Sequence, residues 1–530
     1  MKLKMRSKFW QLFFVYVMCF ARDAKGARIL GLFPLPAISH FNVFTEVMKS
    51  LADAGHQVDV VSHFPRKKPY PNYTDVVNLE SETSLVFVNN LDYDTMAKIT
   101  RNSASAGMQF GGIAVCDMME QSGLKKLIEN PPKDPPYDLV IVEFFVANCY
   151  FAFGRHLDIP IIALGSGSPM LLANEALGNP LNPAIVFEIS EQPIFDSTFW
   201  QRLKNTIGTI MIGMEMRYHT RKQNSIVKKY FGSEMPDVDV LARDISLLLI
   251  NSHHIFHGIR PLTPAVVPIS GIHMRDDEKP ALPVNLKNWL DESEDGFVYM
   301  SFGSMVKIES FPKPIITEMY EAFDKIAPLN VLVKIANPHE LPPGLPKNVL
   351  TLRWAPQIQV LKHKNIRAFI THGGLGGCLE SLRYAVPLIG VPLFADQFSN
   401  IDAAVHRGIA VRLDHEKLTA DKIIEAVKSV VHDTKYKNNM IKLSKEFLDR
   451  PKSPRETSVF WIEYILKHGG DSLRSPAVKL TWWQVELIDV YAFTMAIILL
   501  TFYVAKLTIF MILKKIFNAN ETTKSSKKRD

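Results

Sequence analysis

Short apolar runs alternate with segments of helical periodicity along the first half of the chain. An apolar run at residues 28–33 predicts a β-strand, and the apolar residues Phe41, Phe44, Met48 and Leu51 then recur at the spacing of a helix. Further strands are predicted at residues 58–61, 85–88, 139–142, 161–164 and 247–250. This half therefore opens as a β-α-β unit, but without the GxGxxG turn of a nicotinamide dinucleotide site.

The second half repeats the alternation, with strands predicted at residues 297–301, 331–335, 368–370 and 388–391. A proline-rich stretch at residues 261–283 separates the two series and indicates a linker. Alternating strands and helices in both halves predict an α/β protein with two doubly wound, Rossmann-like domains facing across a cleft. The expected N-terminal domain covers residues 27–260, the linker 261–290 and the C-terminal domain 291–449. Residues 185–231 are less regular and are expected to form helices over the first domain, with a membrane as a candidate neighbour.

The two ends of the chain carry apolar stretches of different kinds. Residues 1–26 begin with basic residues, continue with a short apolar run and end in small residues, which predicts a signal peptide. Residues 485–513 are long enough to cross the hydrocarbon core of a bilayer, with Lys506 as the only charge after residue 489, and predict a transmembrane helix. Basic residues follow at 514–530, so the positive-inside rule places this tail in the cytosol and the domains in the lumen.

The composition is that of a globular protein, with 47% hydrophobic and 22% charged residues. Much of the net charge of +7 comes from the two ends, so no nucleic-acid partner is expected. One of the four cysteines lies in the predicted signal peptide. The others, Cys116, Cys149 and Cys378, are odd in number and lack metal-ligand spacing, so no disulfide framework is predicted. Asn72 opens a glycosylation sequon on the expected lumenal side, whereas Asn520 opens one in the expected cytosolic tail.

The stretch 369–397, FITHGGLGGCLESLRYAVPLIGVPLFADQ, carries the strongest chemical signal. A strand that enters a glycine turn and opens a helix presents backbone N–H groups and the helix dipole to a phosphate. A second apolar run then completes a β-α-β unit, whose ligands bind at the carboxyl ends of the strands. A glycine-rich turn of any α/β domain is the alternative. Polar residues at suitable spacings favour the ligand site: a group able to carry positive charge, a hydroxyl-binding carboxylate and two further polar side chains, namely His372, Glu380, Asp396 and Gln397.

In this segment the sequence resembles the signature of UDP-glycosyltransferases of the membrane-bound animal type, most like the insect members. Further motifs of that family occur in order: LLINSH at 248–253, SFGS at 301–304, WAPQ at 354–357 and FWIEY at 460–464. The resemblance extends from about residue 28 to the C-terminus. It implies the GT-B architecture, a UDP-sugar as co-substrate without another cofactor, and a helix within residues 450–484 that returns to the first domain before a juxtamembrane segment.

Sugar transfer needs a base for the acceptor hydroxyl, and His40 is the candidate. It follows Ser39, a good N-cap, so its imidazole is expected in the first turn of a helix, where the dipole disfavours the charged ring. Alone, such a histidine is more often a surface or capping residue, but the resemblance places the family's catalytic histidine here. In the family an aspartate holds that histidine, and the matching position is Glu143. Asp138 is the alternative, although it lies at the start of its strand.

The resemblance also implies the residues that bind the donor. Trp354 would stack on the uracil, which leaves recognition of the base to Gln357 and backbone groups. Glu380 is suited to accept hydrogen bonds from both ribose hydroxyls. The expected contacts to the diphosphate are His372, the backbone at Gly374 and Gly377, and the Ser304 hydroxyl. Asp396 and Gln397 match the pair that contacts the sugar, and without a DxD-type metal motif the transfer is expected to need no metal.

Two positions depart from the family pattern. Lys334 stands where a donor-contacting arginine is common and keeps the charge without the bidentate fork. Gly376 stands where an asparagine is common. These departures leave the sugar open between glucose, which the insect resemblance favours, and glucuronate or galactose.

The sequence therefore predicts an inverting UDP-glycosyltransferase of the endoplasmic reticulum membrane, with one transmembrane helix and a dilysine-like C-terminus. Its expected acceptor is a small lipophilic hydroxyl compound, in a detoxification-type reaction. Four apolar residues of the first domain fit either the acceptor site or the core: Met108, Phe110, Phe144 and Phe145. A lipid-specific galactosyltransferase and a non-catalytic UDP-sugar-binding membrane protein are the alternatives, and a homo-oligomer is compatible with the sequence.

Overall fold

The computed structural model describes residues 26–79, 90–101, 111–187, 198–275 and 282–526. Two compact units emerge, Met1–Ser475 and Pro476–Asp530. The predicted signal peptide up to residue 25, the strand expected at 85–88, and Met108 and Phe110 lie outside the described residues.

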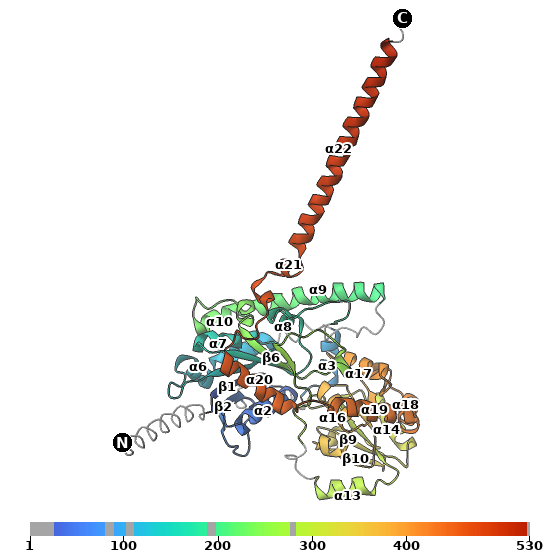
Figure 1. Ribbon diagram of the computed structural model, residues 1–530. Helices are drawn as coiled ribbons and strands as arrows, with labels where there is room; N and C mark the ends of the chain where they lie inside the picture. The colour runs from blue at the N-terminus through green and yellow to red at the C-terminus, as the bar shows by residue number, and fades with distance from the viewer. Residues whose placement is uncertain (1–25, 80–89, 102–110, 188–197, 276–281, 527–530) are drawn as a thin grey trace, which may run out of the picture. The chain divides into compact units, whose positions relative to one another are not determined.

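The first unit contains two parallel sheets with helices around them (Figure 1). Within the described residues, the first sheet has seven strands in the order β3-β2-β1-β4-β5-β6-β7. They are β1 (Arg28–Phe33), β2 (Gln57–Ser62), β3 (Tyr73–Asn78), β4 (Leu139–Glu143), β5 (Ile161–Gly165), β6 (Ile245–Ile250) and β7 (Val266–Pro268). The strand order reverses between β1 and β4, which pair directly with Leu32 opposite Val142. Ligands of doubly wound sheets bind at such a switch point.

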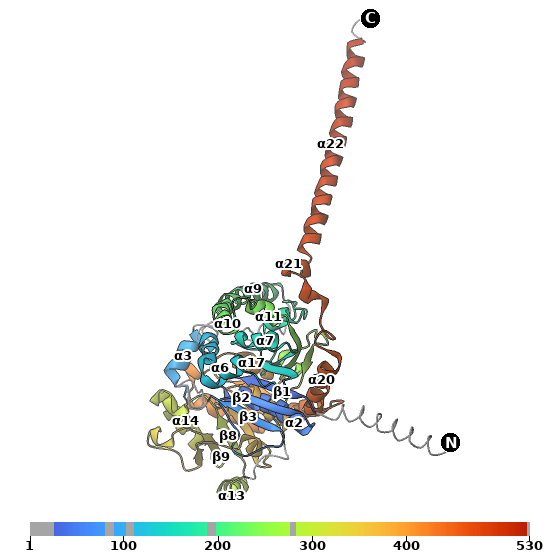
Figure 2. The same ribbon diagram turned by 90° about the vertical axis from the view of Figure 1, so that its left-hand side faces the viewer.

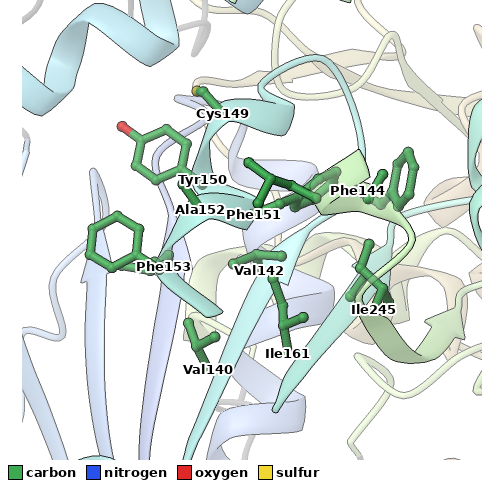
Figure 3. Packing of buried hydrophobic residues seen from close by; sticks show 14 of the residues in the cluster. Val140, Val142, Phe144, Cys149, Tyr150, Phe151, Ala152, Phe153, Ile161 and Ile245 are labelled. Atoms are coloured by element: carbon green, nitrogen blue, oxygen red, sulfur yellow. The ribbon is translucent and has the colours of Figure 1, made fainter. Parts of the chain in front are cut away.

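The helices of this half fill the connections between the strands. They are α2 (Ile38–Asp53), α3 (Tyr93–Arg101), α5 (Ile113–Asp117), α6 (Ser122–Glu129), α7 (Ala152–Leu157), α8 (Leu171–Ala176), α9 (Phe199–Arg221), α10 (Asn224–Phe231), α11 (Val238–Ala242) and α12 (His254–His257). Because side chains alternate along a strand, each strand serves two cores. Ile29 and Ile141 pack toward α2, whereas Val140 and Val142 face the other side. Figure 3 shows these two valines gathered with Phe151 from the segment that follows β4.

The second sheet has six strands among the described residues, in the order β10-β9-β8-β11-β12-β13. They are β8 (Phe297–Ser301), β9 (Asn330–Lys334), β10 (Val349–Leu352), β11 (Ile366–Thr371), β12 (Leu388–Gly390) and β13 (Ala410–Arg412). Its helices are α13 (Val284–Glu292), α14 (Lys313–Lys325), α15 (Gln357–Leu361), α16 (Leu375–Arg383), α17 (Gln397–His406), α18 (Ala420–His432) and α19 (Thr434–Leu448). Here the order reverses between β8 and β11, so this sheet has its own switch point.

Helix α20 (Pro454–His468) follows the second sheet but packs on the first. Its Ile462 and Ile465 enter the core beneath α2, and both ribbon views place α20 beside that helix (Figure 2). Arg455 forms an ion pair of 2.5 Å with Asp53, the last residue of α2. The chain thus returns to its first half through contacts on the helix that carries His40 at its start.

Several features differ from the sequence-based expectation. β7 lies within residues 261–290, so the first sheet continues into the stretch expected to be a linker. Helix α13 begins in the same stretch and packs Leu286 into the second core. Cys116 and Cys149 form a disulfide, so the expectation of no disulfide framework was wrong. An odd count hides a pair when the third cysteine, here Cys378, is a buried free thiol.

The second unit contains η7 (Pro476–Lys479), α21 (Trp482–Val485) and α22 (Ile488–Ser526). Within the described residues, one stretch is long and apolar enough to cross a membrane, Ile488–Asn518. Helix α22 continues through most of the segment expected to be a tail.

Candidate active site

The first half of the site lies at the carboxyl ends of β1 and β4. His40 is the third residue of α2, and Glu143 is the last residue of β4. Nδ1 of His40 donates a hydrogen bond of 2.6 Å to Oε1 of Glu143. The Glu143 side chain is only 6% exposed and that of His40 is 23% exposed, so the ring stands between a buried carboxylate and open space.

The local reason for this placement differs from the expected one. The N-cap of α2 is Ala37, without a side-chain cap, so the prediction that Ser39 caps the helix was wrong. The helix starts two residues earlier, and His40 still lies in its first turn. Asp138, the alternative partner, accepts a hydrogen bond from the backbone N–H of Arg28 at the opposite end of the strands and lies away from His40.

One of the four apolar residues that fitted either the acceptor site or the core, Phe145, borders this pair. The rings of Phe145 and His40 lie 5.1 Å apart in an edge-to-face arrangement, whereas neighbouring Phe144 is buried in the core. Phe145 also lines a small cavity beside Glu143, together with Leu35 and Tyr150. Side chains alternate between the two faces of the chain after β4, so Phe144 points into the core while Phe145 points toward His40.

His372 follows β11 and forms the centre of the second half. Its ring is enclosed by two glycines: a Cβ atom at Gly303 would lie 2.7 Å from the ring, and one at Gly374 would lie 2.8 Å from it. Gly303 also has a φ of +77°, which few other residues adopt. Burial lowers the pKa of His372 to about 4, with Lys334 adding to the effect. The ring is therefore neutral near pH 7, and the expected cation-capable group is instead a neutral hydrogen-bonding group.

Helix α16 begins beside this ring. Gly374 is its N-cap and offers no side-chain cap, so the first N–H groups of the helix keep their capacity to bind an anion. Ser304 is half-buried in the loop after β8, the strand that neighbours β11. A Cβ atom at Gly377 would make ordinary contacts, and one at Gly376 would meet open space. The absence of a side chain at Gly376 therefore has no steric cause.

A chain of hydrogen bonds holds Glu380 on the same helix. The Tyr299 hydroxyl donates to Oε1 of Gln357 (3.2 Å), and Nε2 of Gln357 donates to Oε2 of Glu380 (2.7 Å). The other carboxylate oxygen lies 3.3 Å from Nε2 of His273, a buried residue that no sequence motif pointed to. Gln357 therefore orients Glu380, and a carboxylate still has acceptor capacity beyond these contacts.

Trp354 and Lys334 lie together at the ends of β10 and β9. The Trp354 side chain is 55% exposed, which is unusual for a tryptophan and leaves a ring face accessible. Nζ of Lys334 lies 5.8 Å from the centre of that ring. Burial lowers the pKa of Lys334 to about 8, so its charge is poised close to neutral pH.

Asp396 and Gln397 stand at the start of α17. Oε1 of Gln397 accepts hydrogen bonds from the backbone N–H groups of Leu393 (2.9 Å) and Phe394 (3.0 Å), which fixes the loop before the helix. Asp396 accepts a 2.7 Å hydrogen bond from Asn400. Burial raises the pKa of Asp396, while Asn400 and His40 oppose the shift. His40 thus lies within electrostatic range of Asp396.

Comparison with known proteins bears on the identity of this site. Residues 34–523 match the family model described as UDP-glucoronosyl and UDP-glucosyl transferase. The chain belongs to this family. It is 36% identical over 476 residues to UDP-glucosyltransferase 2 of Dactylopius coccus, covering 89% of this chain and 90% of the relative. It is also 28% identical over 498 residues to an ecdysteroid UDP-glucosyltransferase of Lymantria dispar multicapsid nuclear polyhedrosis virus, covering 90% of this chain and 95% of the relative.

The fold agrees with that assignment. The crystal structure of the glycotransferase of kitacinnamycin matches with a TM-score of 0.54 and 18% identity, covering 84% of this chain and 99% of the other. The prediction of a glycosyltransferase fold with two Rossmann-like domains is confirmed, and the chain is a UDP-glycosyltransferase that uses a UDP-sugar. Across the part of the chain that the structure describes, no group of three or more His, Cys, Asp or Glu side chains is arranged to hold a metal ion.

Proposed function

We propose that this UDP-glycosyltransferase transfers glucose, with inversion, from UDP-glucose to a hydroxyl of a small lipophilic acceptor. The observation that carries the proposal is the 2.6 Å contact between His40 and Glu143 at the switch point of the first sheet. His40 lies within electrostatic range of Asp396 in the second half. Transfer between two bound substrates requires a base on the acceptor side of the site and a carboxylate that contacts the sugar on the donor side.

In the proposed step, Nε2 of His40 takes the proton of the acceptor hydroxyl. Glu143 accepts the hydrogen bond from Nδ1–H, which holds the ring with its Nε2 lone pair free and stabilises the imidazolium that forms. The acceptor oxygen bonds to the anomeric carbon as the bond from that carbon to UDP breaks, and the electron pair leaves on the β-phosphate oxygen. Binding both substrates in register contributes much of the rate.

The second half binds the donor in this proposal. The exposed face of Trp354 stacks on the uracil, and Glu380, held by Gln357, accepts the ribose hydroxyls. Asp396 and Gln397 contact the sugar.

The diphosphate meets the start of α16. Its contacts are the Gly374 and Gly377 backbone, Ser304 and the neutral His372 ring. A neutral imidazole donates a hydrogen bond without a competing charge, and the helix dipole offsets the charge that develops on UDP. The proposal therefore gives no role to a metal ion, and the rate is expected to be unchanged by a chelator.

Two observations support a lumenal site in the endoplasmic reticulum. The Cys116–Cys149 disulfide fits an oxidising compartment, and Asn72 and Thr74 of the sequon are exposed. Helix α22 supplies a membrane anchor that keeps the enzyme where lipophilic acceptors concentrate. The name of the viral relative, an ecdysteroid glucosyltransferase, makes steroid alcohols a sensible part of the acceptor panel, alongside phenols.

The test is an acceptor screen with full-length enzyme in microsomes. Labelled UDP-glucose, UDP-glucuronate and UDP-galactose are each offered with phenols, steroid alcohols and ceramide, with and without EDTA. The proposal predicts the highest kcat/KM for UDP-glucose with a phenol or steroid, unaffected by EDTA. Transfer of galactose to ceramide alone would identify the lipid-specific alternative, and no transfer from any donor would contradict the proposal.

A further inference from the structure

The long helix α9 of the first unit carries a row of large apolar side chains that face away from the protein. Trp200 is 73% exposed, Met211 61% and Tyr218 63%. The row contains further exposed residues at the spacing of one helix face: Phe199, Leu203, Ile207, Ile210 and Met214. We call these eight residues the α9 face. Single exposed apolar side chains are ordinary, but eight on one side of a helix about 35 Å long form a continuous surface.

The opposite side of α9, which packs against the protein, is mainly polar, whereas a soluble domain normally buries the apolar side of a helix. The residues packed against the protein are mainly small or polar: Asn205, Thr209, Gly213, Met216, His219 and Thr220. Asn205 donates to the backbone oxygen of Val186 (2.8 Å), and a Cβ atom at Gly213 would lie 2.6 Å from Leu171 of α8. The protein thus uses the narrow polar side of the helix for packing and turns its apolar side outward.

The ends and flanks of the α9 face identify what covers it. Aromatic residues stand at both ends, with Phe199 and Trp200 in the first turn and Tyr218 in the last turns. Lys204, Arg221 and Lys222 are exposed beside the row, and Nζ of Lys222 lies 4.4 Å from the centre of the Tyr218 ring. Glu215 is the only acidic residue of the helix, against four lysines and arginines. A second copy of the chain would bring these like charges together, whereas a lipid surface receives both charge and aromatic rings.

We propose that the α9 face docks in the interface of a phospholipid bilayer. It would be a second membrane contact, in addition to α22. The proposal rests on the membrane anchoring proposed above. Residues 476–487 are all that separate the first unit from the start of α22, so an anchored chain keeps the first unit within a short tether of the lipid. With α9 in the interface, acceptors dissolved in lipid reach the domain that carries His40 without crossing bulk water.

The experiment uses the full chain reconstituted in phosphatidylcholine–phosphatidylglycerol vesicles. A phosphatidylcholine with a diazirine on its acyl chain is photoactivated, and lipid-modified peptides are mapped by mass spectrometry. The proposal predicts lipid adducts in residues 199–221 as well as in 488–518. The variant Ile207→Glu/Met211→Glu/Met214→Glu is expected to lose adducts in α9 about tenfold and to keep those in α22, with unchanged UDP affinity as evidence of folding.

A matched control places the same charge on apolar residues exposed in the second sheet's domain, Ile441→Glu and Leu448→Glu, and is expected to leave the α9 adducts unchanged. Adducts in 488–518 alone would overturn the docking proposal and leave the anchor intact. Adducts in 199–221 alone would support docking while contradicting the anchor. Protein–protein crosslinks that join 199–222 of two isotopically distinct copies, without lipid adducts, would show that a second copy covers the face and would overturn the proposal.

Discussion

At the residue scale, Glu143 shows that a glutamate can keep the hydrogen bond to His40 that the resemblance assigns to an aspartate. The resemblance implies an aspartate at position 143, and the glutamate found there still reaches Nδ1 of His40 at 2.6 Å. The Glu143 carboxylate is buried while the His40 ring is partly exposed, so the longer side chain fits inside the protein. The sequence predicted Glu143 at the end of a strand and His40 in the first turn of a helix, and both lie there. It could not give the distance between them, because that depends on how α2 packs on the sheet.

Glu143→Asp should weaken the reaction without abolishing it. The shorter side chain withdraws the carboxylate by about one bond length, so we expect kcat to fall roughly tenfold with the KM for UDP-sugar unchanged. Glu143→Gln keeps the length but removes the charge that stabilises the imidazolium, and a loss of 10² to 10⁴ is expected. Steady-state kinetics of both variants provide the measurement. A larger loss for the aspartate than for the glutamine would contradict the assigned role.

His372 follows β11 as the sequence predicted, but its burial favours a neutral ring over the expected charged one. Sequence reasoning treated it as able to carry a positive charge, and the structure encloses it between Gly303 and Gly374. The spacing of a motif predicts the backbone position of a residue. Its burial, which sets its charge, depends on residues that follow another strand, here Gly303 after β8. The same limit applies to His273, which reaches Glu380 from a stretch without any motif.

The lowered pKa of His372 predicts how stability depends on pH. The folded protein holds this ring neutral down to about pH 4, while the unfolded chain takes up a proton below about pH 6.5. The contribution to the free energy of unfolding is therefore complete above pH 6.5 and declines as the pH falls toward 4. Between pH 7.5 and pH 5, this effect lowers the free energy of unfolding by about 2 kcal/mol. In His372→Asn, the loss of thermal stability over that pH range should be smaller than in the wild type. Equal losses would contradict a buried neutral ring.

At the scale of elements, central strands were easier to predict than edge strands. β1, β4, β8 and β11 are almost wholly buried apolar runs, and each lies where the sequence predicted it. The edge strands β3, β7, β10 and β13 were missed. Alternate residues of β3 are exposed, β10 consists of four half-buried residues, and β7 and β13 are only three residues long. Glu143 and His372 lie at the ends of central strands, whereas Trp354 follows the edge strand β10 and was predicted from the family resemblance.

The disulfide is an element-scale feature with a measurable contribution. It ties α5 to the segment η3 (Asn148–Phe151) after β4, where Tyr150 lines the cavity beside Glu143. For a separation of 33 residues, loop-closure entropy gives a stabilisation of roughly 3–4 kcal/mol. Cys116→Ala/Cys149→Ala should therefore lower Tm by several degrees. A reducing agent should lower the wild-type Tm to a similar extent and leave the double variant unchanged. A wild type that ignores the reductant would contradict the bridge.

At the scale of the whole molecule, two sheets each contribute a switch point, and the proposed reaction uses both. Alternating patterns sufficed to predict two Rossmann-like domains, because parallel sheets leave strong apolar runs. The alternation of strands and helices could not predict packing between segments on either side of the domain boundary. β7 extends the first sheet into the expected linker, and the return of α20 to the first sheet came from the family resemblance alone.

The orientation of the chain is a whole-molecule prediction that two sequons can test. If the first unit is lumenal, Asn72 carries a glycan and Asn520 does not. In microsomes, Asn72→Gln should gain electrophoretic mobility equal to that produced by endoglycosidase treatment of the wild type. Asn520→Gln is the matched control and should migrate with the wild type. A shift for Asn520→Gln instead would reverse the proposed topology.

The central claim is that His40 of the first domain deprotonates an acceptor held against a donor bound by the second. The most direct test compares sugar transfer by His40→Ala with wild type, while UDP-sugar binding is measured by calorimetry. His339→Ala, which changes an exposed histidine, is the matched control. The account predicts a loss of 10² to 10⁴ in kcat for His40→Ala with the Kd for the donor unchanged, and no loss for the control. Transfer by His40→Ala at the wild-type rate would contradict it.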